Sequence, residues 1–178
     1  MLLQKKTVRL AINAVMIAVY IVLSLFAIPI GGLKITFEHF PVVLCAIIFG
    51  PIDAMLVGGI GEFINQMTTF GFTPTTVLWI LPIVVRGLCM GLGKNSMETI
   101  IQKKVPVVFV MVCVGSGLIS SLLNTVALYV DSKLFGYYSF ALVFGALSVR
   151  LLLSVLTSII ICIAIKPILH ALKHDRLV

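Results

Sequence analysis

Long apolar stretches that follow one another along the chain are the feature that most constrains its fold. A helix needs about 20 mostly apolar residues to cross the hydrocarbon core of a bilayer, which is about 30 Å thick. Such stretches fill most of the chain from residue 8 to residue 165, with only short interruptions. Of the 178 residues, 61% are hydrophobic and 11% are charged, whereas a soluble domain has about 25% charged residues. The sequence therefore predicts an all-α integral membrane protein and leaves little mass for a soluble domain.

Six transmembrane helices are expected from the positions of these interruptions. The first is longer than the apolar region of a signal peptide, which has about 7–15 residues, so we expect it to remain in the protein. Proline interrupts a helix and restricts the residue before it. Gly50-Pro51 should therefore separate the second helix from the third, with one kinked helix as the alternative. The six helices are expected at residues 8–28, 38–49, 52–69, 74–93, 105–130 and 139–165.

Polar segments between the expected helices mark their ends. Thr73 is suited to cap the fourth helix, with Pro74 at the first position, where a missing backbone N–H costs nothing. Residues 94–104 form the most polar interior segment and suit a short amphipathic surface helix, and residues 131–138 are expected to form a loop. We find no sequence repeat, low-complexity tract or linker, so residues 1–178 are predicted to form a single domain.

Lysine and arginine residues collect on one side of this six-helix arrangement, whereas the opposite loops hold only Lys34 and Lys133. Cytoplasmic loops of membrane proteins are enriched in these residues, so both termini are predicted to lie inside the cell. The same bias explains the net charge of +7 without a nucleic-acid partner. The nine residues on the inner side are Lys5, Lys6, Arg9, Lys94, Lys103, Lys104, Lys166, Lys173 and Arg176.

Three charged residues, Glu62, Arg86 and Arg150, fall well inside the expected helices, away from the helix ends. A charge at the bilayer centre costs about 3 kcal/mol on insertion scales, so such residues usually face a cavity or a partner. With a rise of about 1.5 Å per residue, Arg86 lies about 18 Å, Arg150 about 16 Å and Glu62 about 10 Å below the outer ends of their helices. Asn65, Gln66 and Asn124 also fall in the outer halves of their helices. We therefore expect a polar cavity that opens to the outside.

The balance of these charges bears on what such a cavity would hold. Two arginines and one carboxylate leave a net intramembrane charge of +1. A buried arginine without an acidic partner favours an anion, so a ligand that carries a carboxylate is expected. The alternative is an internal ion pair between Glu62 and one arginine that holds helices together.

Aromatic and small residues each allow two interpretations. The aromatic residues at the outer ends of the helices suit either an interfacial belt or a lid that stacks on a flat ligand. Small residues one helical turn apart, Ala14 with Ala18 and Gly87 with Gly91, allow close helix approach, either within the chain or to a partner. The aromatic residues are Phe70, Phe72, Trp79, Phe135, Tyr137 and Tyr138.

No catalytic, metal-binding or cofactor motif is found, so the chain is not predicted to be an enzyme. The segment from Gly87 to Ser96 resembles a phosphate-binding loop, but Asn95 stands where a magnesium-binding Ser or Thr is required. The cysteines stand alone in apolar runs and are expected to be small buried hydrophobic residues, and the histidines are expected to be peripheral and solvated. The four cysteines are Cys45, Cys89, Cys113 and Cys162, and the three histidines are His39, His170 and His174.

Several of these features together resemble the substrate-binding S component of energy-coupling factor (ECF) transporters. They are the six short helices, a second helix that ends in Phe49-Gly50-Pro51, the glycine-rich residues 57–62 and the alanine pair of the first helix. Residues 72–82, with Arg86-Gly87-Leu88 after them, are similar to the folate-specific branch. The family resemblance covers nearly the whole chain, and the folate assignment depends mainly on the fourth helix.

The resemblance implies a mechanism. S components bind a vitamin in an outward cavity that the 1–2 and 3–4 loops gate, and they associate with a membrane scaffold subunit and two cytoplasmic ATPases. ATP hydrolysis drives toppling of the S component, which releases the vitamin inside a prokaryotic cell. The docking surface of the family is an alanine ridge on the first helix, which corresponds here to Ala14 and Ala18.

For folate, the pterin edge would suit Glu62 or Asn65, and the pterin face would stack on Phe72 or Trp79. The carboxylates would suit either arginine, and the reverse direction of the bound ligand is the alternative. The alternatives are an S component for riboflavin or thiamine, a small intramembrane enzyme with Glu62 as its base, and a structural subunit without a ligand. The residues predicted to bind substrate are Glu62, Asn65, Phe72, Trp79, Arg86, Asn124 and Arg150.

Overall fold

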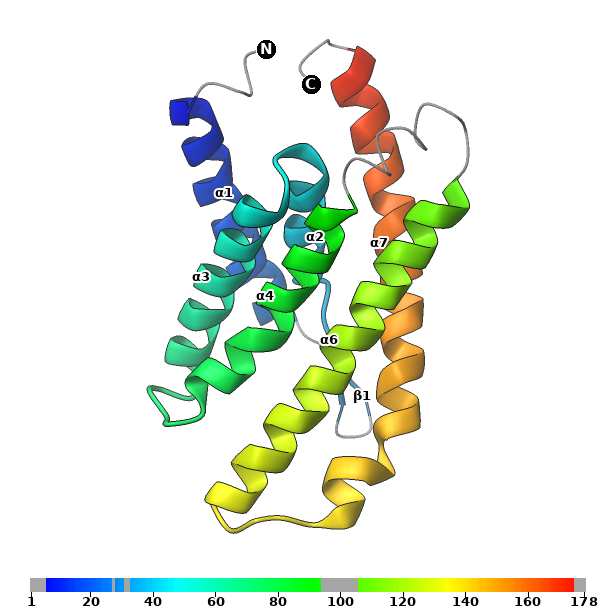
Figure 1. Cartoon of the computed structure of the whole chain (residues 1–178). Helices are drawn as coiled ribbons and strands as arrows, with labels where there is room; N and C mark the ends of the chain where they lie inside the picture. The colour runs from blue at the N-terminus through cyan, green and yellow to red at the C-terminus, as the bar shows by residue number, and fades with distance from the viewer. Residues whose placement is uncertain (1–5, 27, 31–32, 94–105, 175–178) are drawn as a thin grey trace.

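The structure is a computed structural model that describes residues 6–26, 28–30, 33–93 and 106–174. This part of the chain forms six α-helices, one π-helical turn and a two-stranded antiparallel hairpin (Figure 1). The surface helix expected at residues 94–104 lies outside the described residues. The elements are α1 (Lys6–Leu25), β1 (Ile28–Ile30), β2 (Leu33–Ile35), α2 (His39–Ile48), α3 (Pro51–Thr69), α4 (Thr76–Leu92), α6 (Pro106–Leu134), η2 (Ala141–Gly145) and α7 (Leu147–His174).

Three helical segments are long and apolar enough to cross a membrane, namely Lys6–Leu25, Val107–Leu134 and Ala141–Ile168. The helices α2 and α4 are apolar but shorter. In Figure 1, α1 begins and α7 ends at the same end of the bundle, which we call the terminal end. This arrangement agrees with the predicted helical membrane protein, whereas the count of six spans and the inward orientation of both termini stay predictions.

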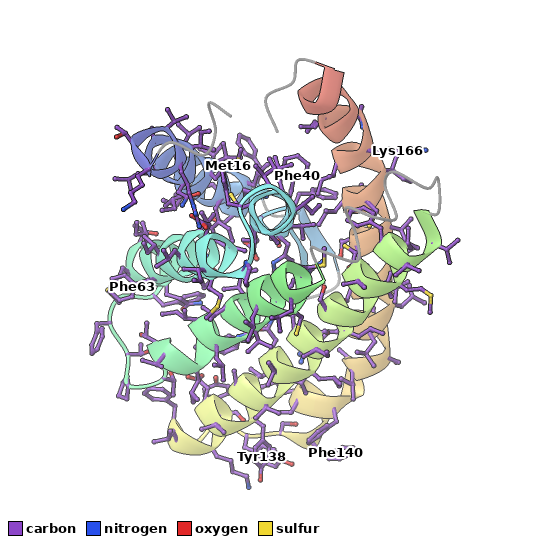
Figure 2. All side chains as sticks on the ribbon, turned by 45° about the horizontal axis from the view of Figure 1, so that its top comes forward. Met16, Phe40, Phe63, Tyr138, Phe140 and Lys166 are labelled. Carbon is purple, nitrogen blue, oxygen red and sulfur yellow. The ribbon has the colours of Figure 1, made fainter. Side chains whose placement is uncertain are left out.

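The shortest helix lies deepest. In α2, all seven residues from Pro41 to Ile47 are buried. The helices α1, α3, α4 and α7 enclose α2 (Figure 1). Met16 of α1 and Phe40 of α2 pack against this core (Figure 2). At its end, Gly50 has a φ of 102°, a backbone conformation that favours glycine, and Pro51 starts α3. The predicted turn between the second and third helices is therefore confirmed, and the single kinked helix is wrong.

Glycines bring α4 into contact with α3. A Cβ atom at Gly87 would lie 2.9 Å from the carbonyl carbon of Ala54, and one at Gly91 would lie 2.2 Å from the Cα of Pro51. Any larger residue at Gly91 would therefore collide with backbone, and only glycine allows this close crossing. The pair Gly87 and Gly91 thus serves packing within the chain.

Three helix boundaries differ from the expected ones for local reasons. Helix α4 begins at Thr76 with Thr75 as its cap, because the Thr73 N–H donates to the Thr76 hydroxyl at 3.0 Å and holds Pro74 in a turn. Helix α6 continues to Leu134, into the segment predicted to be a loop, and α7 continues to His174 with Pro167 inside it. The sequence also did not predict the hairpin, which pairs Ile28 with Ile35.

Candidate functional site

A cavity of about 760 Å³ occupies the half of the bundle away from the terminal end. We call this half the cavity end. The last turns of α1 and α3, the first turns of α4 and α7, the middle of α6 and the segment before α2 supply its walls. Leu25 and Phe70, both strongly exposed, lie at its mouth. The helices therefore enclose a pocket that opens at one end of the bundle, as the depths of the polar residues predicted.

Six of the seven residues predicted to bind substrate line this cavity. Phe72 does not, because its side chain is 77% exposed in the loop between α3 and α4, and the neighbouring Phe70 lines the cavity instead. Of the six aromatic residues expected to form a belt or a lid, only Phe70 and Trp79 line the cavity. The structure brings the other predicted residues together, and their role in binding stays a prediction. The six residues are Glu62, Asn65, Trp79, Arg86, Asn124 and Arg150.

Glu62 is 8% exposed and its carboxylate accepts hydrogen bonds from three neutral groups. The donors are the Tyr20 hydroxyl at 2.8 Å, the Asn65 amide at 3.1 Å and the Gln66 amide at 2.7 Å. All of these groups are described, and neither Arg86 nor Arg150 forms an ion pair with Glu62. The alternative prediction of a Glu62–arginine pair is therefore wrong.

Arg86 lies at the floor of the cavity and is 1% exposed. Its Nη2 atom donates to the Ser158 hydroxyl at 3.0 Å, and its buried Nε has no hydrogen-bond partner among the described residues. A Cβ atom at Gly117 would lie 2.5 Å from the Ser158 Oγ and 3.4 Å from the Arg86 Nη2. Glycine at position 117 thus leaves the space in which the guanidinium meets α7. Since Arg86 follows Trp79 by seven residues, it lies roughly 10 Å deeper along α4.

Arg150 lies in the α7 wall of the cavity, and its guanidinium already has acceptors within the protein. Its guanidinium donates to the backbone carbonyls of Leu142 at 3.2 Å and Val143 at 3.4 Å, and the residue is only partly buried. These carbonyls belong to the π-helical turn η2, so Arg150 joins that turn to the cavity wall. The two arginines therefore differ in depth and in how fully their donors are already used.

Unpaired buried atoms also mark this cavity. Of the four buried polar side-chain atoms without a partner in the described part of the chain, three belong to cavity-lining residues: His39 Nδ1, Arg86 Nε and Ser120 Oγ. An unsatisfied buried polar group costs about 1–3 kcal/mol, so a ligand or water that bonds to these atoms would be stabilised. The prediction that His39 is peripheral is wrong, because this partly buried first residue of α2 lines the cavity and its Nδ1 atom is buried.

Sequence reasoning also missed hydroxyl groups on the cavity wall. Ser120 lies one turn from Asn124 on α6, and Ser154 and Thr157 lie one and two turns beyond Arg150 on α7. Residues three or four apart share one face of a helix, so this spacing from recognised polar residues would have been a usable signal. Serine and threonine alone did not stand out, because they are common in membrane helices and their cost there is low.

A second polar cluster ties α1 to α3 near the terminal end. Asp53 accepts from Arg9 Nε at 2.8 Å and from the Asn13 amide at 2.6 Å, and it also forms an ion pair with Arg9 Nη2. Asp53 lies in the first turn of α3, where a negative charge is favourable. The cation of Arg9 also lies 5.9 Å from the centroid of the Phe49 ring. This cluster fastens two helices without facing the cavity.

Ala14 and Ala18 are both exposed on α1, beside the exposed Val15. In the described part of the chain they do not pack inside the bundle, unlike Gly87 and Gly91. The two small-residue pairs therefore have different surroundings, and the docking role of the alanine pair stays a prediction. Of the four cysteines, Cys45, Cys113 and Cys162 are buried as expected.

Comparison with known proteins gives two findings. The family described as "ECF transporter, substrate-specific component" matches residues 8–172 of this chain. A solved structure described as "Structure and mechanism of the S component of a bacterial ECF transporter" superposes with a TM-score of 0.64. The superposition covers 95% of this chain and 99% of that chain at 18% sequence identity, so it shows likeness of fold alone. No curated protein matches the chain in sequence.

Proposed function

The chain belongs to the family of ECF transporter substrate-specific components, and from this premise we propose that it is the folate-binding subunit of a vitamin importer in a prokaryotic plasma membrane. Members of this family are membrane transport subunits rather than enzymes. They bind a small-molecule substrate and work with a module that consists of a scaffold subunit and ATPases. What we propose beyond the family is the identity of the substrate and the residues that bind it.

One observation carries the folate proposal: a single cavity combines a buried acceptor, an indole ring and two guanidinium groups. Folate combines a flat pterin that has amine and ring N–H donors with an aryl amide and two carboxylates. The Glu62 carboxylate is an acceptor for the donors, the Trp79 ring is a surface for stacking, and the arginines are donors for the carboxylates. Neutral riboflavin would leave both guanidinium groups without an anion, and cationic thiamine would lie beside them unfavourably.

The two arginines differ in what a ligand carboxylate would offer them. Arg86 is almost fully buried, and its Nε has no acceptor in the described part of the chain. Arg150 is partly exposed and already donates to two carbonyls. A charged group in a low-dielectric site gains more from a charge-assisted hydrogen bond than a hydrated one. We therefore propose that Arg86 is the principal anion-binding residue of the cavity and that Arg150 contributes less.

Delivery of the ligand follows from the division of labour within the family. We propose that the exposed face of α1 around Ala14 and Ala18 contacts the scaffold subunit, where small residues allow close approach. The ATPases would then drive reorientation of the whole bundle, and this chain needs only to bind and release the vitamin.

The proposal is tested by titrating purified protein with folate, riboflavin and thiamine in a calorimeter. We expect folate to bind with one-to-one stoichiometry in the absence of ATP, and the other two vitamins to bind far more weakly. Tight binding of another vitamin without folate binding would reject the folate assignment and leave the family unchanged. Turnover of a lipid or other substrate by the purified chain would instead favour an intramembrane enzyme.

A further inference from the structure

A single carboxylate near the end of α6 accepts hydrogen bonds from three separate positions. Asp131, in the last turn of α6, accepts from the Thr75 hydroxyl and the Tyr137 hydroxyl. Its Oδ1 atom also lies 3.5 Å from the indole Nε1 of Trp79. The donors come from the cap of α4, the first turns of α4 and the segment between α6 and η2. Asp131 therefore joins three parts of the chain.

Helix stability alone does not account for a carboxylate at this position. Asp131 lies three residues before the last residue of α6, where the helix dipole disfavours a negative charge. Accepting several hydrogen bonds compensates that effect, and hydrogen bonds to a charged acceptor are roughly twice as strong as neutral ones. Asp131 therefore contributes through its hydrogen bonds to other elements and does not stabilise α6 itself.

The bonds from α4 reach the cavity wall. Thr75 is fully buried and caps α4, and Trp79, one turn later, lines the cavity. The Thr75 hydroxyl also lies 3.2 Å from the hydroxyl of Thr73, in the loop between α3 and α4. A carboxylate that holds Thr75 and Trp79 therefore fixes both the start of α4 and the orientation of the indole ring.

The bond from Tyr137 fastens the segment between α6 and η2. Partial burial, together with the bond to Asp131, raises the pKa of Tyr137 to about 12, so its phenol remains a donor at neutral pH. The next residue is held separately, because the Lys133 Nζ lies 4.0 Å from the centroid of the Tyr138 ring, which meets the Tyr129 ring edge-on at 5.6 Å. In Figure 2, Tyr138 lies at the end of the bundle opposite the terminal end. Tyr137 and Tyr138 thus anchor the same segment through independent contacts.

We propose that Asp131 is a positioning residue that holds Trp79 in the cavity wall and ties it to the segment after α6, and that it thereby limits how fast the bound ligand leaves. The inference rests on the proposed function in one respect, that the ligand occupies this cavity. Loss of the carboxylate frees the indole ring and the start of α4 together. Dissociation then accelerates, while association, which depends on the open mouth, changes little.

Trp79 is the one tryptophan of the chain, so its fluorescence reports its surroundings directly. We would prepare Asp131→Asn and Tyr137→Phe, with Tyr138→Phe as the matched control that removes a neighbouring hydroxyl and leaves the carboxylate alone. Without ligand, Asp131→Asn should shift the emission to longer wavelength and increase quenching by acrylamide. With folate, its dissociation rate in stopped-flow measurements should rise about tenfold, and Tyr137→Phe should give a smaller rise. Tyr138→Phe should match the wild-type protein in both measurements.

Each alternative outcome has a defined meaning. Wild-type emission and an unchanged dissociation rate in Asp131→Asn would overturn the inference, as would a lowered thermal stability without either change, since a merely structural contact would do that. If the wild-type protein binds no folate, the proposed function fails, and the ligand-free quenching still decides whether Asp131 positions Trp79. If Asp131→Asn does not fold, Tyr137→Phe decides in its place, and equality with Tyr138→Phe would overturn the inference.

Discussion

Two buried carboxylates of α3, nine residues apart, have different kinds of hydrogen-bond partner in the rest of the chain. Asp53 is 4% exposed and is paired with the guanidinium of Arg9 and the amide of Asn13. Glu62 is 8% exposed and accepts only from neutral groups in the described part of the chain. At the terminal end the negative charge meets a cation within the protein, whereas at the cavity end the charged groups are left apart.

This difference indicates what each end does. A buried charge that has its own partner within the chain fastens helices and is costly to break. Charges kept apart in one cavity, such as Glu62 and Arg86, hold hydrogen-bonding capacity that a ligand of complementary shape can use. On this account the terminal end provides stability, and the cavity end provides recognition at some cost in stability.

The strongest way to break the comparison is to remove the cation at the floor of the cavity. We expect Arg86→Ala to weaken folate binding by about 2–5 kcal/mol, since a ligand carboxylate is then left unpaired. Arg86→Lys should also weaken binding, because lysine lacks the planar fork of arginine. Arg150→Ala is the matched change and should cost less, because its donors already bond to Leu142 and Val143. Wild-type affinity in both alanine variants, measured by calorimetry, would refute the anion-binding role.

The next prediction concerns the acceptor at the cavity end. Glu62→Gln keeps the shape of the side chain and removes its charge, so we expect folate binding to weaken by about 1.5–3 kcal/mol, the range for a hydrogen bond to a charged group. Calorimetry on the folded variant measures this loss. If Glu62→Gln binds as the wild-type protein does, the carboxylate serves only the contacts to Tyr20, Asn65 and Gln66.

The same chemical change at the other carboxylate sharpens the contrast. We expect Asp53→Asn to leave the affinity for folate unchanged and to lower the free energy of unfolding by about 1–3 kcal/mol. The loss should fall at the lower end of that range, because Arg9 is half-exposed and can return to water. Thermal unfolding in detergent checks the stability of Asp53→Asn, and calorimetry checks its affinity for folate. Both measurements are made side by side with Glu62→Gln. A weaker affinity in Asp53→Asn would mean that the two ends are coupled.

The smallest effect on affinity is expected on the exposed face of α1. Ala14→Trp or Ala18→Trp should leave folate affinity near that of the wild-type protein and abolish uptake and complex formation, because a bulky residue blocks close approach of the scaffold subunit. Val126→Trp, at a strongly exposed position on a different helix, α6, is the control and should transport normally. Loss of affinity together with a normal complex would contradict the docking role.

The hydropathy pattern predicted the described helices well, because the length of an apolar stretch follows from the thickness of the bilayer. The Gly50-Pro51 turn was predicted for an equally local reason, since proline restricts its predecessor. The depths of Glu62, Arg86 and Arg150 correctly placed them in one half of the bundle, because depth depends only on position along a helix.

Features that depend on the rotation and pairing of helices could not be predicted in this way. The partner of Glu62, the pairing of Arg9 with Asp53 and the burial of His39 all depend on which helices become neighbours. Phe72 was chosen for its aromatic ring, but the loop directs it away from the cavity and presents Phe70. Asp131 was assigned to a loop. Two of its donors, Thr75 and Trp79, lie far away in the sequence, and the third, Tyr137, lies in the same predicted loop, whose conformation the sequence did not predict.

The most direct test of the account is an experimental structure of the protein in complex with folate. The account predicts the ligand at the cavity end, against Trp79, with an acceptor bonded to Arg86 Nε and a donor bonded to Glu62, while the Arg9–Asp53 pair stays unchanged. A ligand bound outside this cavity, or inside it with Arg86 Nε still unpaired, would contradict the claim that the separated charges of the cavity end are the recognition site.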